Sequence, residues 1–121
     1  MIKIILFFLF VFLDFFSKFL IKNNLTLNQS IEFNRYFDLV YIQNYGVSFG
    51  FLSGAVSHWF LIFIALLVVL LVTYLMFISK KILEKLAYFI IIIGAISNIL
   101  DRTINTFVVD FISIHYKKFY W

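Results

Sequence analysis

Two aspartates stand nine residues apart in the stretch NILDRTINTFVVDF (98–111), at the point where a long apolar run ends. Nine residues of continuous helix turn through about 900°, which would place Asp101 and Asp110 on opposite faces. The β-branched stretch FVVDF (107–111) favours an extended segment instead. We therefore expect a helix to end near residues 102–105, with Asp110 on a segment that can fold back over the helix end.

Asp110 is the candidate for catalysis, although a lone aspartate at a membrane surface is more often solvated. The chain has no cysteine, and His58 and His115 lack metal-ligand spacing, so we expect neither a metal nor another cofactor. The chemistry left to an aspartate is that of an aspartic-protease dyad, in which two carboxylates share one proton. Within this chain no spacing singles out the second carboxylate, for which the candidates are Asp101, Asp14 and Asp38.

The composition places these carboxylates in a membrane protein. The chain is 64% hydrophobic and 13% charged, with a mean hydropathy of +1.06, which is too apolar for a soluble domain of this length. The net charge of +4 comes from scattered lysines that orient membrane segments, so nucleic-acid binding is not indicated.

Three apolar stretches predict membrane-spanning helices at 2–21, 59–78 and 86–104. The first has no small-residue cleavage site after it and is interpreted as an uncleaved span. The loop 79–85 holds three lysines and is expected on the cytoplasmic side by the positive-inside rule. Residues 23–57 and the segment 105–121 then lie outside, and 1–121 forms a single integral membrane domain.

Polar and apolar residues roughly alternate in IEFNRYFDLVYIQNYG (31–46), which is rich in β-forming residues and closes on a turn-like Gln-Asn-Tyr-Gly. This pattern predicts a small sheet at the outer membrane surface. The fold class is therefore a membrane all-α protein with a small β element.

Two groups of polar residues lie inside the predicted spans. Asp14 and Lys18 are four residues apart and share a helix face, where they either neutralise each other or line a polar cavity near the outer surface. Gly94, Asn98 and the Asp101–Arg102 pair form a stripe on the third span. The plain interpretation of this stripe is a packing seam, in which Gly94 lets another helix approach closely.

Four motifs in order carry a resemblance to a known family: DFFSK (14–18), NYGVSFG (44–50), GAISNILDR (94–102) and VVDF (108–111). On a three-span frame with the N-terminus inside, this order resembles signal peptidase II, the bacterial lipoprotein signal peptidase, over essentially the whole chain. The resemblance implies a four-helix aspartic endopeptidase of the inner membrane with a periplasmic β-cradle. Such an enzyme cuts lipid-modified prolipoproteins before the modified cysteine. We expect it to act as a monomer among membrane lipids.

The resemblance also implies roles for individual residues. Asp110 matches one of the two catalytic aspartates. The residues expected to line the substrate channel or to support the site are Asn44 and Gly46 in the cradle strand, Asn98, Asp101 and Arg102 in the third span, and Asp14 and Lys18 in the first span.

The chain departs from the family pattern at Ser48, Ser97 and Thr106, which are modest exchanges for small residues. The family's second catalytic aspartate lies in a Phe-Asn-x-Ala-Asp motif at the start of a fourth helix, which is expected beyond Trp121. A fragment of a normal enzyme is favoured over a truncated, inactive relative. Two further hypotheses are a small ion-coupled transporter that uses Asp14 and a structural membrane subunit.

Overall fold

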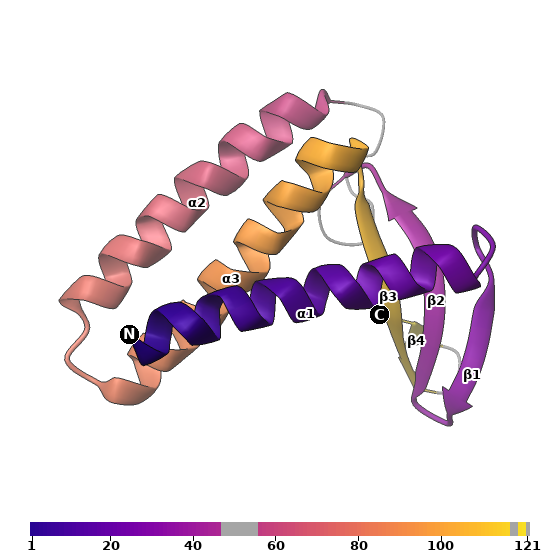
Figure 1. Cartoon of the computed structure of the whole chain (residues 1–121), viewed down its shortest axis with the longest axis horizontal. Helices are drawn as coiled ribbons and strands as arrows, with labels where there is room; N and C mark the ends of the chain where they lie inside the picture. The colour runs from indigo at the N-terminus through magenta and orange to yellow at the C-terminus, as the bar shows by residue number, and fades with distance from the viewer. Residues whose placement is uncertain (47–55, 117–118, 121) are drawn as a thin grey trace.

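The protein is described by a computed structural model over residues 1–46, 56–116 and 119–120. These residues form three helices, α1 (Ile2–Asn24), α2 (His58–Ile78) and α3 (Ile82–Asn105), and four strands, β1 (Ser30–Asn34), β2 (Phe37–Asn44), β3 (Val108–Tyr116) and β4 (Phe119–Tyr120). Figure 1 shows α2 and α3 at one side of the molecule and the sheet at the other, with α1 running from the helices across to the sheet. Ser48 and the end of the NYGVSFG motif lie outside the described residues.

The three helices have the length and composition of membrane spans. The stretches that meet both requirements are Ile4–Asn24, His58–Ile78 and Ile82–Asn105. The helix α2 is the most apolar of them, and it begins where the Ser57 hydroxyl accepts a hydrogen bond from the backbone N–H of Trp59. The predicted fold class, a membrane all-α protein with a small β element, is confirmed.

The connection between α2 and α3 is shorter than the charge pattern predicts. The helix α3 begins at Ile82, so only residues 79–81 link the two helices. Glu84 stabilises this early start, because its carboxylate accepts a hydrogen bond from the Ser79 hydroxyl at 2.8 Å and pairs with Lys81 at 3.0 Å. A carboxylate in the first helical turn also interacts favourably with the helix dipole.

The sheet is antiparallel, with the strand order β1-β2-β3-β4. A turn at residues 35–36 divides the alternating stretch 31–46 into β1 and β2, and the Asn34 side chain accepts the backbone N–H of Tyr36 at 2.9 Å within this turn. The strand β3 comes from the segment after α3 and pairs along β2. The small sheet is thus confirmed, and part of it is supplied by the strand that carries Asp110.

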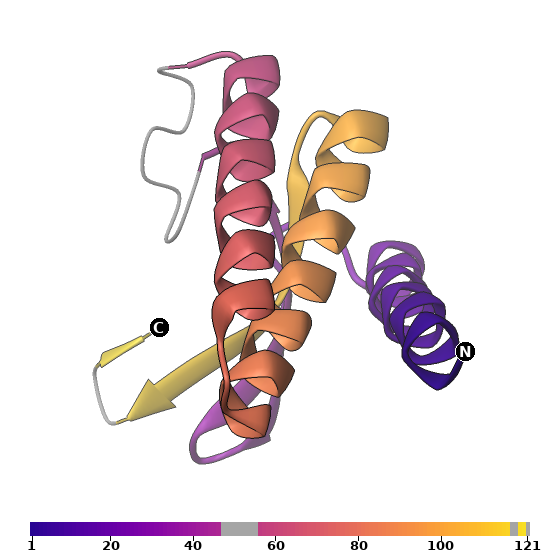
Figure 2. The same cartoon turned by 90° about the vertical axis from the view of Figure 1, so that its left-hand side faces the viewer.

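The C-terminal end of α1 packs against the sheet. Its contact is a small apolar core in which Leu25, Tyr41 and Val109 are buried and against which Ile21 and Phe107 pack. Figure 2 shows α3 lying between α2 and α1, so that α3 is the central helix of the three. This arrangement brings the ends of α1 and α3 to the start of β3.

The expected close helix contact at Gly94 is wrong for the described residues. A Cβ atom added to Gly94 would meet nothing within 4 Å. Gly94 itself is exposed, and the buried positions of α3 nearest to it are Ile92, Ile93 and Ser97. The helix α1 meets this stripe further along α3, at Asn98 and Asp101.

Candidate active site

The candidate site lies where α3 ends and β3 begins. Thr106 follows the last helical residue in the left-handed conformation, with φ 70°, and turns the chain so that β3 can start two residues later. Asp101 therefore sits on the last turns of the helix and Asp110 on the strand. The expectation that the helix ends before Asp110 is confirmed.

Asp101 is buried, and its carboxylate links two segments of the chain instead of being exposed. It is 2% exposed, and its Oδ2 atom accepts the backbone N–H of Val109 at 2.7 Å. Its Oδ1 atom accepts the side-chain amide of Asn105 at 2.7 Å. Both oxygens are thus used to fasten the start of β3 to the end of α3.

Lys18 links α1 to Asp101. Its Nζ atom lies 2.9 Å from a carboxylate oxygen of Asp14, 2.9 Å from Oδ1 of Asn98 and 3.6 Å from Oδ2 of Asp101. The residue is 5% exposed. A buried charge is costly unless partners surround it, and here two carboxylates and an amide do so. The Asp14–Lys18 pair is therefore part of a cluster between two spans, not only a local pair.

Asp110 is half-buried and faces a different set of groups. Its Oδ2 atom accepts a hydrogen bond at 2.9 Å from the side-chain amide of Asn44 on β2. The Oδ1 atom of Asn44 in turn accepts the backbone N–H of Gly46 at 2.8 Å. Because Ile42 is the register partner of Asp110, pairing between β2 and β3 sets the position of its carboxylate.

Arg102 contributes a positively charged guanidinium group to the cluster around Asn44 and Gly46. It is 7% exposed, donates a hydrogen bond to the carbonyl of Gly46, and interacts electrostatically with both Asp110 and Asp101. Its Nε atom is buried without a hydrogen-bond partner among the described residues. The guanidinium thereby ties Gly46, which follows β2, to the last turn of α3.

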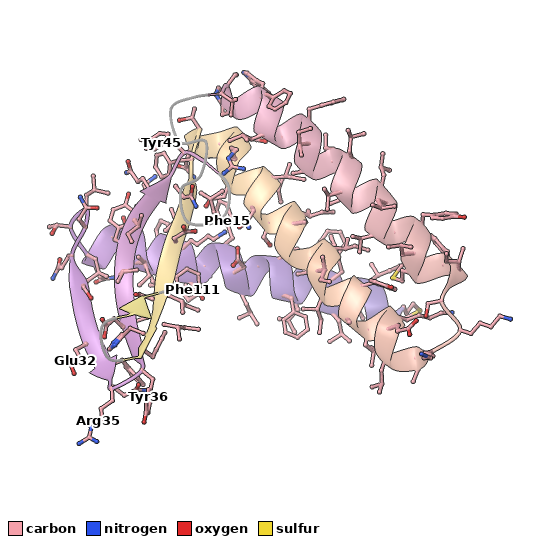
Figure 3. The ribbon with its side chains drawn as sticks, turned by 180° about the vertical axis from the view of Figure 1, so that it is seen from behind. Phe15, Glu32, Arg35, Tyr36, Tyr45 and Phe111 are labelled. Carbon is pink, nitrogen blue, oxygen red and sulfur yellow. The ribbon has the colours of Figure 1, made fainter. Side chains whose placement is uncertain are left out.

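The structure thus gathers the predicted residues into two neighbouring clusters. The first, between α1 and α3, holds Asp14, Lys18, Asn98 and Asp101, and the second, between β2, β3 and α3, holds Asn44, Gly46, Arg102 and Asp110. Figure 3 shows Tyr45 at the end of the sheet near α3 and Arg35 and Tyr36 at the opposite end. Tyr45 packs on Phe107 with ring centroids 5.4 Å apart.

Sequence reasoning missed Asn105 and Lys22. Asn105 donates to Asp101 and accepts a hydrogen bond from Lys22 Nζ at 2.9 Å. The spacing of four between Asp101 and Asn105 was a usable signal, because such residues share a helix face. The contact with Lys22 joins residues 83 positions apart and leaves no local signal.

The other acids suggested for a dyad have partners of their own. Asp14 pairs with Lys18, Asp101 is held as described above, and Asp38 lies 3.2 Å from Nε2 of His115 in the half of the sheet away from Asp110. Among the described residues, none of these three carboxylates is placed to share a proton with Asp110.

Comparison with known proteins gives a consistent result. A model of the family described as signal peptidase (SPase) II matches residues 6–121. The chain is 34% identical over 113 residues to a lipoprotein signal peptidase of Pseudoalteromonas atlantica, covering 90% of this chain and 69% of that protein. It is 39% identical over 107 residues to a lipoprotein signal peptidase of Klebsiella pneumoniae, covering 85% of this chain and 64% of that protein.

Solved structures match as well. A bacterial membrane enzyme determined by the in meso method at 2.3 Å resolution has a TM-score of 0.79 and 25% identity, covering 93% of this chain and 70% of its own. A second structure with the same description, at 1.9 Å resolution, has a TM-score of 0.74. Set against the two lipoprotein signal peptidases, this chain spans about two thirds of their length.

Proposed function

This chain belongs to the signal peptidase II family, and we propose that the complete protein is an aspartic endopeptidase that removes signal peptides from diacylglyceryl-modified prolipoproteins. It cleaves before the lipid-modified cysteine. The observation that carries this proposal is the placement of Asp110: a half-buried carboxylate that accepts a hydrogen bond from Asn44 and interacts electrostatically with Arg102, where α3 leads into the sheet.

Asp110 supplies one of two catalytic carboxylates in this proposal. A dyad works because two close carboxylates share one proton, so that one activates water while the other donates to the peptide carbonyl. Asn44 is a positioning residue, since its amide orients the Asp110 carboxylate and its carbonyl oxygen binds the backbone of Gly46. Arg102 donates a hydrogen bond to the Gly46 carbonyl, and its positive charge interacts electrostatically with the Asp110 carboxylate.

The second carboxylate is proposed to come from a Phe-Asn-x-Ala-Asp segment that follows Trp121 in the complete protein. Two observations support this. The lipoprotein signal peptidases that match are longer than this chain, and Asp14, Asp38 and Asp101 are each engaged elsewhere. The DNA sequence downstream of codon 121 tests this directly, and a stop codon in that place would contradict it.

The proposed location is the bacterial inner membrane, with the site on the periplasmic side and a monomer as the working unit. Lysines at the α2–α3 connection and the polar clusters at the other end of α3 support this orientation. The hypothesis of an ion-coupled transporter gains no support, because Asp14 forms an ion pair with Lys18, which also lies beside Asp101.

The function is tested with the complete protein purified in detergent and two forms of one prolipoprotein, with and without the diacylglyceryl group on the cysteine. Mass spectrometry of the products should reveal a single cut before the cysteine in the modified form only. Equal cleavage of both forms, or a cut at another peptide bond, would contradict the proposed specificity. Absence of cleavage by the complete protein would contradict the activity itself.

A further inference from the structure

A cleft of about 190 Å³ lies between α1 and α3, and Asp101 and Val109 are among the residues that line it. Its apolar wall is formed by Phe15 and Phe19 of α1 and Ile104 of α3. Phe19 and Ile104 are exposed at 55% and 64%, so the described residues leave the cleft open on this side. Figure 3 shows Phe15 on α1 near the place where this helix passes α3.

Lys22 provides the charge of this cleft. Its ammonium group donates to Asn105 and lies 5.8 Å from the centre of the Phe107 ring. The other lysine that lines the cleft, Lys18, is already surrounded by Asp14 and Asp101. Within the described residues Lys22 forms no ion pair, and an ammonium with one hydrogen bond to Asn105 keeps further N–H donors for an anion.

Lys22 lies at the end of a helix of membrane-spanning length, where lipid phosphates are expected. Lys22 lies in the last turn of α1, and Asn105 is the last residue of α3, so both mark the outer ends of membrane-spanning helices. A lysine at this depth normally reaches toward the headgroup layer. The apolar wall continues from there toward the middle of the helices, where an acyl chain would lie.

We propose that this cleft binds an anionic phospholipid of the outer leaflet, with its phosphate on Lys22 and one acyl chain along Phe15, Phe19 and Ile104. The charge decides the class of lipid: a single cation without an acidic partner among the described residues favours a headgroup with net negative charge over a zwitterionic one. The proposed peptidase activity assigns no lipid to this cleft, although Lys18 and Asp101 of the first polar cluster also line it.

The site is connected to the catalytic strand by hydrogen bonds. Lys22 donates to Asn105 at 2.9 Å, Asn105 donates to Asp101 at 2.7 Å, and Asp101 accepts the backbone N–H of Val109 at 2.7 Å. A phosphate bound to Lys22 would restrict the motion of its side chain. Through these hydrogen bonds it would also restrict the motion of Asn105 and Asp101. In the complete enzyme the bound lipid would therefore hold the residue before Asp110 in place, a consequence that rests on the proposed function.

Binding is tested without reference to cleavage, by native mass spectrometry of the complete protein in detergent with added phosphatidylglycerol, phosphatidylcholine or inorganic phosphate. The protein should retain phosphatidylglycerol about tenfold more than phosphatidylcholine, as expected for a charge-assisted hydrogen bond. Lys22→Gln should lower its retention to that of phosphatidylcholine. Lys22→Arg should restore it, and Lys80→Gln at the other membrane surface should leave it unchanged.

Several outcomes would overturn the site. Undiminished retention of phosphatidylglycerol by Lys22→Gln would show that the lipid binds elsewhere. Displacement of the lipid by inorganic phosphate would show that the site recognises free phosphate rather than a lipid. Ile104→Trp, which fills the apolar cleft and leaves Lys22 intact, should also reduce retention, and full retention by that variant would contradict the acyl-chain position.

Cleavage measured on the same preparations separates the two proposals. Loss of lipid retention with normal cleavage would leave the peptidase function intact and contradict only the coupling through Asn105. Absence of cleavage with normal, Lys22-dependent retention would contradict the peptidase function and leave the lipid site intact.

Discussion

Asp101 and Asp110 are close in the sequence, but their surroundings suit them to different roles. Both oxygens of Asp101 accept hydrogen bonds within the protein, and Lys18 lies beside it. One carboxylate oxygen of Asp110 accepts a hydrogen bond from Asn44, and the residue is half-buried. Asp101 is suited to holding structure, and Asp110 is suited to meeting a substrate.

Asp101→Asn should destabilise the protein. The substitution removes one of the two carboxylates beside the buried Lys18 ammonium and turns an amide toward that of Asn105. Breaking a buried ion pair by removing one partner typically costs about 3–5 kcal/mol, and we expect the lower end because Asp14 remains.

Unfolding of the detergent-solubilised protein measures this effect. Glu32→Gln, a charge removal on the exposed edge strand, is the control and should change the free energy of unfolding by less than about 0.5 kcal/mol. Equal stability of Asp101→Asn and Glu32→Gln would show that Asp101 does not hold the helix end.

Asn44→Ala should slow catalysis more than it weakens substrate binding. The substitution removes the hydrogen bond that orients the Asp110 carboxylate and the one that accepts the Gly46 backbone. We expect about a tenfold fall in kcat with little change in KM, the size of one lost hydrogen bond to a charged group.

Steady-state cleavage of a lipid-modified prolipoprotein provides both constants. Gln43→Ala is the matched control, because the Gln43 side chain bonds to Tyr41 and Tyr45. An unchanged kcat for Asn44→Ala, or a change in KM alone, would contradict the positioning role.

At the scale of elements, Thr106 decides how α3 leads into β3. It has φ 70° at the helix C-cap, a region that a β-branched residue adopts only at a cost and that glycine adopts freely. The chain turns here so that Val109 meets Asp101. The strain at this position is offset by the contacts that it permits.

Thr106→Gly should therefore stabilise the protein by about 0.5–1 kcal/mol, because relief of the left-handed strain exceeds the entropy that glycine adds to the unfolded chain. Ala87→Gly is the control within the preceding helix and should destabilise by about 1 kcal/mol. Unfolding in detergent compares the two variants. A loss of stability in both would contradict the account of the helix end.

The elements that local patterns encode were predictable. Hydropathy indicated the three spans, and the switch to β-branched residues indicated that Asp110 lies beyond the helix. The turn at residues 35–36 was missed because apolar and polar residues alternate on both sides of it. The pairing of β3 with β2 and the contact between Lys18 and Asn98 join distant parts of the chain, so no local pattern encodes them.

At the scale of the whole molecule, the polar clusters lie at one end of α3 and the lysine-rich connection at the other. Because these 121 residues include no cysteine, single-cysteine variants report the side of the membrane without interference from them. Arg35→Cys in the β1–β2 turn should react with a membrane-impermeant maleimide in spheroplasts. Lys80→Cys should react only after the membrane is permeabilised. The reverse pattern would contradict the proposed orientation.

The central claim is that the Asp110 carboxylate takes part in peptide-bond hydrolysis. The direct measurement is single-turnover cleavage of a diacylglyceryl-modified prolipoprotein by the complete protein carrying Asp110→Asn, next to Asp38→Asn, which removes a carboxylate far along the sheet. We predict a fall of at least about 10³-fold for Asp110→Asn, with unchanged membrane insertion and unfolding temperature, and a normal rate for Asp38→Asn. Cleavage by Asp110→Asn at the rate of the unsubstituted protein would contradict the claim.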